Sequence, residues 1–259
     1  MNILVLIKQV PDTATRIQDR VRDGRLDLNG VTWVVNPYDE YAVEEALRLK
    51  EKHGGTVTLI AMGPERVDKA LKDALALGAD AGVHVWDPAF ENLDARGKAV
   101  VLAAAVRKLP FDMIWTGWKG VDDDQGLVPI YLAHALGLSY VSFVVAIDVD
   151  DTHVTVRREI EGGKEVVAVD LPAVFSAQKG LNEVRYASLK GIMAVKSKVI
   201  PRWDAAELGL DPAALPGADV ETIVIERPPD RAAGRILDGE PAAAARELLR
   251  LLHEEARVI

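Results

Sequence analysis

The sequence predicts an α/β protein built on a doubly wound parallel sheet. Short β-type apolar runs alternate with stretches of helical periodicity from the N-terminus to about residue 149, and glycine, proline or asparagine separates many of them. Such strand–helix alternation is typical of parallel sheets covered by helices on both faces. The run at residues 3–7 is apolar throughout, as expected for a strand with no solvent-facing side.

The elements follow in a regular order. Residues 14–35 are polar and rich in turn residues, which indicates a small hairpin excursion, and either Asn36 or Asp39 is expected to cap the helix that follows. Gly78 and Gly137 end two later helices, and Pro110 ends a third. The pattern predicts strands at residues 3–7, 56–61, 82–86, 113–116 and 140–149, and helices at residues 41–52, 66–77, 92–109 and 125–136.

The pattern changes after residue 149. A turn at residues 150–151 and two alternating segments, 154–158 and 165–170, predict an antiparallel ribbon at the edge of the sheet, and residues 171–176 return as an apolar strand. We therefore expect one domain over residues 1–200. Residues 201–259 form an arm rich in proline and glycine that ends in an amphipathic helix at 240–256. The leucines of this helix need an apolar surface, on the parent domain or on another subunit, and the length of the arm favours another subunit.

Composition excludes several classes of function. The chain has 259 residues, 49% hydrophobic and 27% charged, and no apolar run reaches the roughly 18 residues of a membrane span. The first apolar run is too short for a signal peptide, so a cytoplasmic protein without membrane insertion is expected. The absence of cysteine excludes disulfides and thiol chemistry, and the net charge of -9 argues against nucleic-acid binding. The five histidines show no metal-ligand spacing, so no metal site is expected.

Three loops meet at the carboxyl edge of the predicted sheet: residues 8–13, 36–39 and 117–126, with the turn at 61–63 beside them. The third is the most informative, because a buried strand runs into glycines and the start of a helix. Backbone N–H groups left unpaired there can cradle a phosphate. Asp122, Asp123 and Asp124 either cap the helix or bind a ribose hydroxyl. The alternative reading is a capped loop that binds nothing.

The chain resembles the beta subunit of electron-transfer flavoproteins along nearly its whole length. The resemblance rests on residues 5–12, 36–46, 76–80, 156–176, 181–193 and 234–259, of which the segment 181–193 is the most distinctive. It implies an adenine-nucleotide-binding, Rossmann-like fold and a heterodimer. The alpha subunit would carry the redox FAD, and this subunit a structural AMP without catalytic residues of its own. The pair would carry electrons from acyl-CoA and related dehydrogenases to a quinone oxidoreductase, with the arm packing on the alpha subunit.

The resemblance also implies site residues. The AMP site maps onto Leu6, Asn36, Pro37, Tyr38, Asp39, Met62, Gly117, Lys119, Gly120, Val121, Asp122, Asp123, Asp124, Gln125, Gly126, Leu127 and Val128. The chain departs from the family pattern at Trp118, Leu127 and Pro129, and a proline removes one N–H from a phosphate cradle.

Two further residues have implied roles. Tyr38 matches a residue that approaches the flavin of the alpha subunit; alternatively it only packs over the start of the helix. Leu189, in a recognition loop near 181–193, matches the leucine that anchors the partner dehydrogenase; alternatively it covers this chain's own core. Its polar neighbours Ser188 and Lys190 favour the anchor.

Other functions remain open. An ATP-dependent enzyme on the same fold would need a phosphate-binding signature such as Gly-x-x-x-x-Gly-Lys-Ser/Thr, which is absent, and a nucleotide-binding regulatory module would be shorter. Within the leading hypothesis, the site holds either AMP or a second FAD, with AMP as the default.

Overall fold

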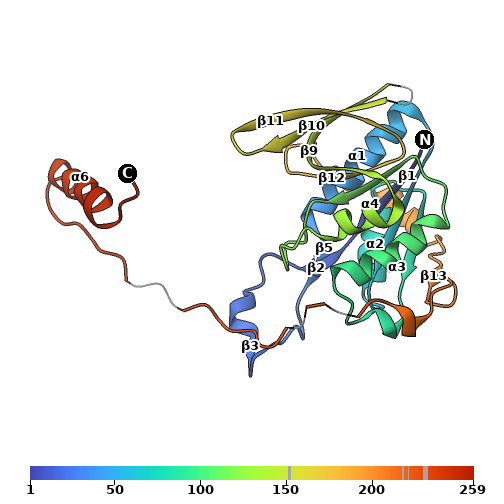
Figure 1. Cartoon of the computed structure of the whole chain (residues 1–259), viewed down its shortest axis with the longest axis horizontal. Helices are drawn as coiled ribbons and strands as arrows, with labels where there is room; N and C mark the ends of the chain where they lie inside the picture. Colours follow the sequence, from blue (N-terminus) through green and yellow to red (C-terminus); the bar gives the residue numbers. More distant parts are fainter. Residues whose placement is uncertain (151–152, 218, 221, 230–232) are drawn as a thin grey trace.

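The computed structural model describes residues 1–150, 153–217, 219–220, 222–229 and 233–259. Within them, nine strands form one mixed sheet in the order β11-β10-β9-β12-β8-β1-β6-β7-β13 (Figure 1). Every neighbouring pair is parallel except in the ribbon of β9, β10 and β11. The strands are β1 (Asn2–Ile7), β6 (Thr56–Met62), β7 (Ala81–Val85), β8 (Met113–Gly117), β9 (Ser139–Asp150), β10 (His153–Ile160), β11 (Gly163–Asp170), β12 (Ala173–Ala177) and β13 (Arg202–Trp203).

Helices cover both faces of the sheet, which confirms the predicted doubly wound α/β class. One apolar core lies between the sheet and the helices α1 (Pro37–His53) and α2 (Val67–Leu75). The opposite core lies under α3 (Ala95–Arg107) and α4 (Val128–Leu136). Strand β1 pairs with β6 on one side and with β8 on the other, so the chain changes direction across the sheet between β1 and β8. Ligands of such folds bind at the carboxyl ends of the strands at this switch point.

The strands lie within a residue or two of the predicted ranges, and the helices differ more. Helix α1 begins at Pro37, earlier than the apolar periodicity indicated, because proline suits the first helical position. The predicted start of the fourth helix at Gln125 is wrong: α4 begins at Val128. Asp124 and Gly126 have φ values of 53° and 62°, left-handed conformations that a helix cannot include, and Pro129 then occupies its first turn.

The N-terminal excursion is more ordered than a loop. Residues 8–13 contain a short strand β2 (Gln9–Pro11), which pairs with β5 (Trp33–Val35). Between them lie a 3₁₀ turn (Ile17–Arg20) and the predicted hairpin, formed by β3 (Val21–Arg22) and β4 (Arg25–Leu26). The predicted ribbon is also confirmed, and β10 pairs with both β9 and β11. Of the predicted turn at 150–151, residue 151 lies outside the described residues.

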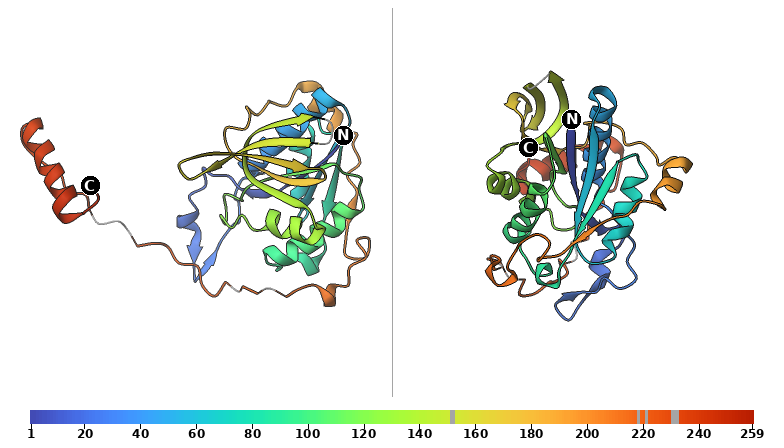
Figure 2. Two further views of the ribbon diagram at one scale, coloured as in Figure 1. Left: turned by 45° about the horizontal axis from the view of Figure 1, so that its top comes forward. Right: turned by 90° about the vertical axis from the view of Figure 1, so that its right-hand side faces the viewer.

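The C-terminal segment leaves the body gradually. Strand β13 adds to the sheet beside β7, and Ala205 and Leu208 are buried in the core under α3. The arm then passes a 3₁₀ turn (Pro212–Ala214) and the hairpin, where the Ile225 N–H donates to the Gly24 carbonyl at 3.0 Å. Helix α6 (Pro241–Arg250), continued by a π-helical turn (Leu251–Glu255), lies apart from the body (Figures 1 and 2). Across the described ranges, no helix has the length and apolarity needed to span a membrane.

Candidate functional site

A cavity of about 510 Å³ opens where β1, β6 and β8 end. The three predicted loops contribute to it, together with the turn after β6 and the first turns of α3 and α4. The predicted residues that line it are Leu6, Asp39, Met62, Gly117, Lys119, Gly120, Asp122, Asp123, Gln125, Gly126, Leu127 and Val128. The sheet topology therefore brings together most of the residues that the resemblance indicated.

The remaining predicted residues, Asn36, Pro37, Tyr38, Val121 and Asp124, do not line the cavity. Asn36 is buried and occupies the N-cap position of α1, as expected, but its side chain makes no cap hydrogen bond. Its amide nitrogen donates to the Lys119 carbonyl at 2.9 Å, and its amide oxygen accepts from the Val121 N–H at 3.2 Å. Asn36 thus anchors the loop of residues 117–126, the glycine-bearing loop, through these two hydrogen bonds.

Asp39 joins the two strands at the switch point. Its carboxylate accepts from the backbone N–H of Lys8 at 2.6 Å, from the N–H of Gly117 at 2.8 Å and from the Asn36 amide at 3.0 Å. A Cβ on residue 117 would collide with this carboxylate, so the close approach requires glycine. Burial raises the pKa of Asp39 to about 7, although the three donors and the nearby Lys8 ammonium oppose that shift.

Lys8 closes the glycine-bearing loop over the end of β1. Its ammonium lies 2.7 Å from Asp122 and 2.9 Å from Asp123. Burial lowers the pKa of Lys8, but the hydrogen bonds and charges of these two carboxylates outweigh it, so the pKa lies above its ordinary value. A second pair, Lys119 with Asp124 at 2.7 Å, folds the same loop onto itself. The predicted cap or ribose ligands are therefore engaged with lysines.

The part of the cavity lined by the start of α4 can accept an anion. In the described chain no acceptor faces the N–H groups of Gly126, Leu127 and Val128, which lie at the start of α4. Lys98 lines the cavity from the first turns of α3. Burial, followed by repulsion from Lys8, lowers the pKa of Lys98, while Asp122, Asp123 and Asp94 act in the opposite direction. Helix N-termini with nearby lysines are typical of phosphate sites.

Much of the cavity lining is apolar. Ile60, Trp86, Phe90 and Leu102 contribute to it beside Leu6 and Met62, so a flat base would meet hydrocarbon and ring surfaces. The predictions missed Lys8, Lys98 and Trp86. Lys8 follows directly after a predicted strand and Trp86 is the last residue of another, which is a usable signal, whereas Lys98 lies inside a helix and carries no signal in the sequence.

Two further features lie outside the cavity, a half-buried aromatic cluster and an exposed leucine. Tyr38 packs edge-on against Trp118, with ring centroids 5.4 Å apart, and Trp118 packs in turn on Phe143 at 4.8 Å. Leu189, the first residue of α5 (Leu189–Val195), is 77% exposed, which excludes the alternative that it covers the core of this chain.

Comparison with known proteins identifies the family. The family model of the electron transfer flavoprotein domain matches residues 24–208. The electron transfer flavoprotein subunit beta of Bacillus subtilis (strain 168) is 38% identical over 262 residues, covering all of both chains. Protein FixA of Azotobacter vinelandii is 35% identical, covering 88% of this chain and 83% of its own. The caffeyl-CoA reductase-Etf complex subunit CarD of Acetobacterium woodii is 33% identical, covering 92% of each. This chain therefore belongs to the electron transfer flavoproteins, as a member of their beta subunits with a role in electron transfer.

Proposed function

We propose that this chain binds AMP in the cavity at the switch point and forms a heterodimer with an alpha subunit that carries FAD. The observation that carries the proposal is the composition of the cavity lining, which combines apolar side chains with unpaired N–H groups and lysines. A cavity of about 510 Å³ lies within the roughly 300–1,000 Å³ typical of small-ligand pockets. AMP, with one base and one phosphate, matches this polarity.

The residues present fit the nucleotide in a specific way. The N–H groups of Gly126, Leu127 and Val128 would hold the phosphate, with Lys98 supplying charge from α3. Leu6 and Met62 would pack against the base. The chain's own contribution is to bind and orient, since the FAD of the alpha subunit supplies the redox chemistry when it is bound.

The same proposal covers the partners. Leu189 would dock acyl-CoA and related dehydrogenases, and the flavin would pass their electrons to a quinone oxidoreductase, in fatty acid oxidation in the cytoplasm. Support for docking comes from the exposure of Leu189 and of its neighbours on α5. Helix α6 would pack on the alpha subunit, because in the described chain its apolar side faces no part of the body (Figure 2).

Identifying the bound nucleotide tests the central claim. The chain is co-expressed with the alpha subunit, the purified complex is denatured, and the released small molecules are quantified by mass spectrometry. One AMP and one FAD per complex are expected. Two FAD molecules would establish the alternative in which this site holds a flavin, and a complex without any adenine compound beyond the FAD of the alpha subunit would refute a nucleotide site in this chain.

A further inference from the structure

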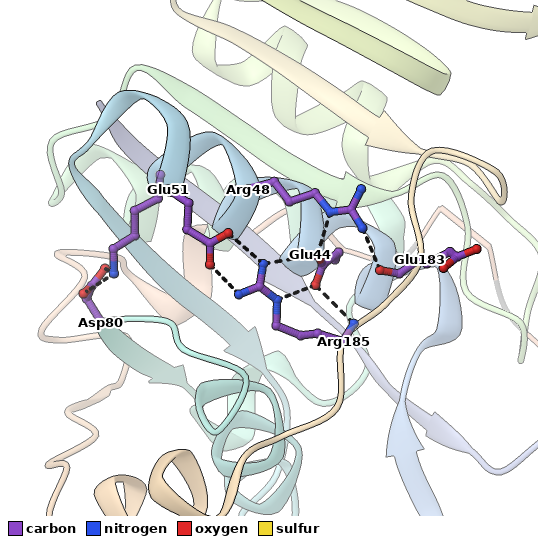
Figure 3. Close-up of polar contacts among 7 residues, drawn as sticks. Glu44, Arg48, Glu51, Asp80, Glu183 and Arg185 are labelled. Carbon is purple, nitrogen blue, oxygen red and sulfur yellow. Dashed lines mark hydrogen bonds and ion pairs between the residues drawn. The ribbon is translucent and has the colours of Figure 1, made fainter.

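Arg185 holds an irregular segment of the chain against the side of α1. This segment, residues 181–188, runs from the sheet to α5. Three of the nitrogens of the Arg185 guanidinium reach two glutamates of α1 (Figure 3): Nε donates to Glu44 at 2.7 Å, Nη1 to Glu51 at 2.5 Å, and Nη2 to both at 3.2 and 3.1 Å. All five N–H donors of an arginine point outward in one plane, so two carboxylates two helical turns apart can share it.

Glu44 makes this contact stronger than a surface ion pair. It is only 2% exposed, and a buried carboxylate without partners would be costly. Burial raises the pKa of Glu44, but the hydrogen bonds from Arg185 and Arg48 outweigh it and the pKa lies below its ordinary value. For Glu51, the hydrogen bond from Arg185 is the main cause of a lowered pKa. The carboxylates of Glu44 and Glu51 therefore stay ionised and paired with Arg185 at neutral pH.

Three more hydrogen bonds attach the same segment to α1. The Asn182 amide donates to Glu45 and to the Tyr41 carbonyl, both at 2.9 Å. Arg48 donates to the Glu183 carbonyl at 3.0 Å (Figure 3). We call these contacts, together with those of Arg185, the α1 clamp. The clamp holds three of the four residues at positions 182–185, two of them also through their backbone: the Glu183 carbonyl, and the Arg185 N–H that donates to Glu44 at 3.2 Å.

Directly after the clamp the chain presents apolar side chains to solvent. Tyr186 is 97% exposed, and Leu189, Ile192 and Met193 of α5 are all exposed as well. Ser188 starts α5 by accepting from the Gly191 N–H at 3.0 Å. Gly191 also approaches the Ala76 carbonyl so closely that a Cβ there would collide with it. The exposed surface is thus held between the clamp on α1 and the end of α2.

We propose that Arg185 is a positioning residue for docking of the redox partner. It fixes the direction in which the surface of Tyr186, Leu189, Ile192 and Met193 faces, without contacting the partner, because its guanidinium is already engaged with Glu44 and Glu51. A segment ordered before binding loses less conformational freedom in the complex, and this gain appears as affinity. The inference rests on the proposed function, since it assumes that a dehydrogenase docks at Leu189. Two exposed lysines in or next to α5, Lys190 and Lys196, match a partner with an acidic rim.

The test uses the intact heterodimer with its cofactors. Electron transfer from a substrate-reduced acyl-CoA dehydrogenase is measured at increasing concentrations of the heterodimer, for the wild type and for Arg185→Met, Arg185→Lys, Leu189→Ala and the double variant Arg185→Met/Leu189→Ala. Arg185→Met is expected to raise KM about tenfold and to change kcat less than about twofold, because the freed segment would lose its conformational freedom only on binding the partner. Arg185→Lys should recover part of the loss. Lys69→Met, which removes an exposed ion pair with Asp73 on α2, is the matched control and should leave KM unchanged.

A double-mutant cycle separates positioning from general destabilisation. If Arg185 acts through the exposed surface, its loss and the loss of Leu189 are not additive, so the double variant resembles the worse single variant. Hydrogen exchange of residues 181–193 should also rise in Arg185→Met while that of the cavity loops stays constant. An unchanged KM in Arg185→Met, or additive effects in the cycle, would overturn the inference. If Leu189→Ala alone has no effect, the proposed docking site fails instead.

A milder variant covers the case in which Arg185→Met does not fold. Glu51→Gln removes only the exposed end of the clamp and leaves buried Glu44 paired with both arginines. It should fold normally and raise KM about two- to threefold. A KM equal to that of the wild type, together with unchanged hydrogen exchange over residues 181–193, would count against the clamp.

Discussion

Asp39 provides the sharpest test of the switch-point geometry. Its carboxyl is buried and its pKa is raised to about 7, whereas an aspartate in the unfolded chain titrates near the ordinary value of 3.8. Between these two values the folded state binds more protons than the unfolded state. The contribution of Asp39 to the free energy of unfolding is therefore greatest below the pKa of the unfolded state. It falls as the pH rises toward 7, by at most about 1.4 kcal/mol per pH unit. From pH 5.5 to pH 8.5 the loss is about 2 kcal/mol.

The variant Asp39→Asn isolates this effect, because it keeps the shape of the side chain and cannot titrate. All other ionisable groups are common to both proteins, so their contributions cancel in the difference. Thermal unfolding of the heterodimer at pH 5.5, 7.0 and 8.5 should show the wild type losing about 2 kcal/mol, or a few degrees, relative to the variant as the pH rises, with most of the change below pH 7. A difference that does not vary over this range would show that Asp39 is already ionised at pH 5.5 and that its N–H donors outweigh burial.

Three further predictions concern the cavity and the arm. Gly117→Ala should lower the amount of bound nucleotide per complex by more than half, because the added Cβ collides with the Asp39 carboxylate. Gly234→Ala, where the added Cβ meets no other atom, is the control and should leave the nucleotide content unchanged. Equal nucleotide content in both variants would contradict the close approach of residue 117 to Asp39. Lys98→Met should weaken AMP binding about fivefold to tenfold and leave adenosine binding unchanged, as measured by calorimetry on the nucleotide-free complex. Equal losses of affinity for both ligands would show that Lys98 does not contact the phosphate. Leu248→Glu, on the apolar side of α6, should reduce the fraction of chain that co-elutes with the alpha subunit in size-exclusion chromatography; full co-elution at micromolar concentration would exclude α6 from the interface.

The sequence predicted the sheet because each strand is a local signal. Continuous apolar runs between glycines and prolines identify β1, β6, β7 and β8, and their order along the chain implies that their carboxyl ends meet. The position of the cavity followed from this reasoning alone. The boundary of α4 did not, because the left-handed conformations at Asp124 and Gly126 interrupt a stretch whose apolar pattern is still helical.

Contacts between distant residues could not be predicted in this way. The hydrogen bonds by which Asn36 and Asp39 anchor the loop after β8 reach residues 119, 121 and 117. The periodicity of the sequence does not indicate such distant pairs. Arg185 and Glu44 are separated by 141 positions, and no local pattern in the sequence pairs them. Only the folded chain shows that Glu44 is buried and that Arg185 compensates it.

Helix α1 joins both functional regions through one rigid rod. Asp39, near its first turn, borders the cavity, and Glu51, in its last turns, carries the outer end of the clamp; the two lie roughly 18 Å apart along the helix axis. A continuous helix does not stretch or shorten measurably at ambient temperature. If the proposed nucleotide and docking sites are right, their spacing along α1 stays the same within this subunit, and a change in donor-to-acceptor distance during turnover would have to come from movement of the proposed partner chain.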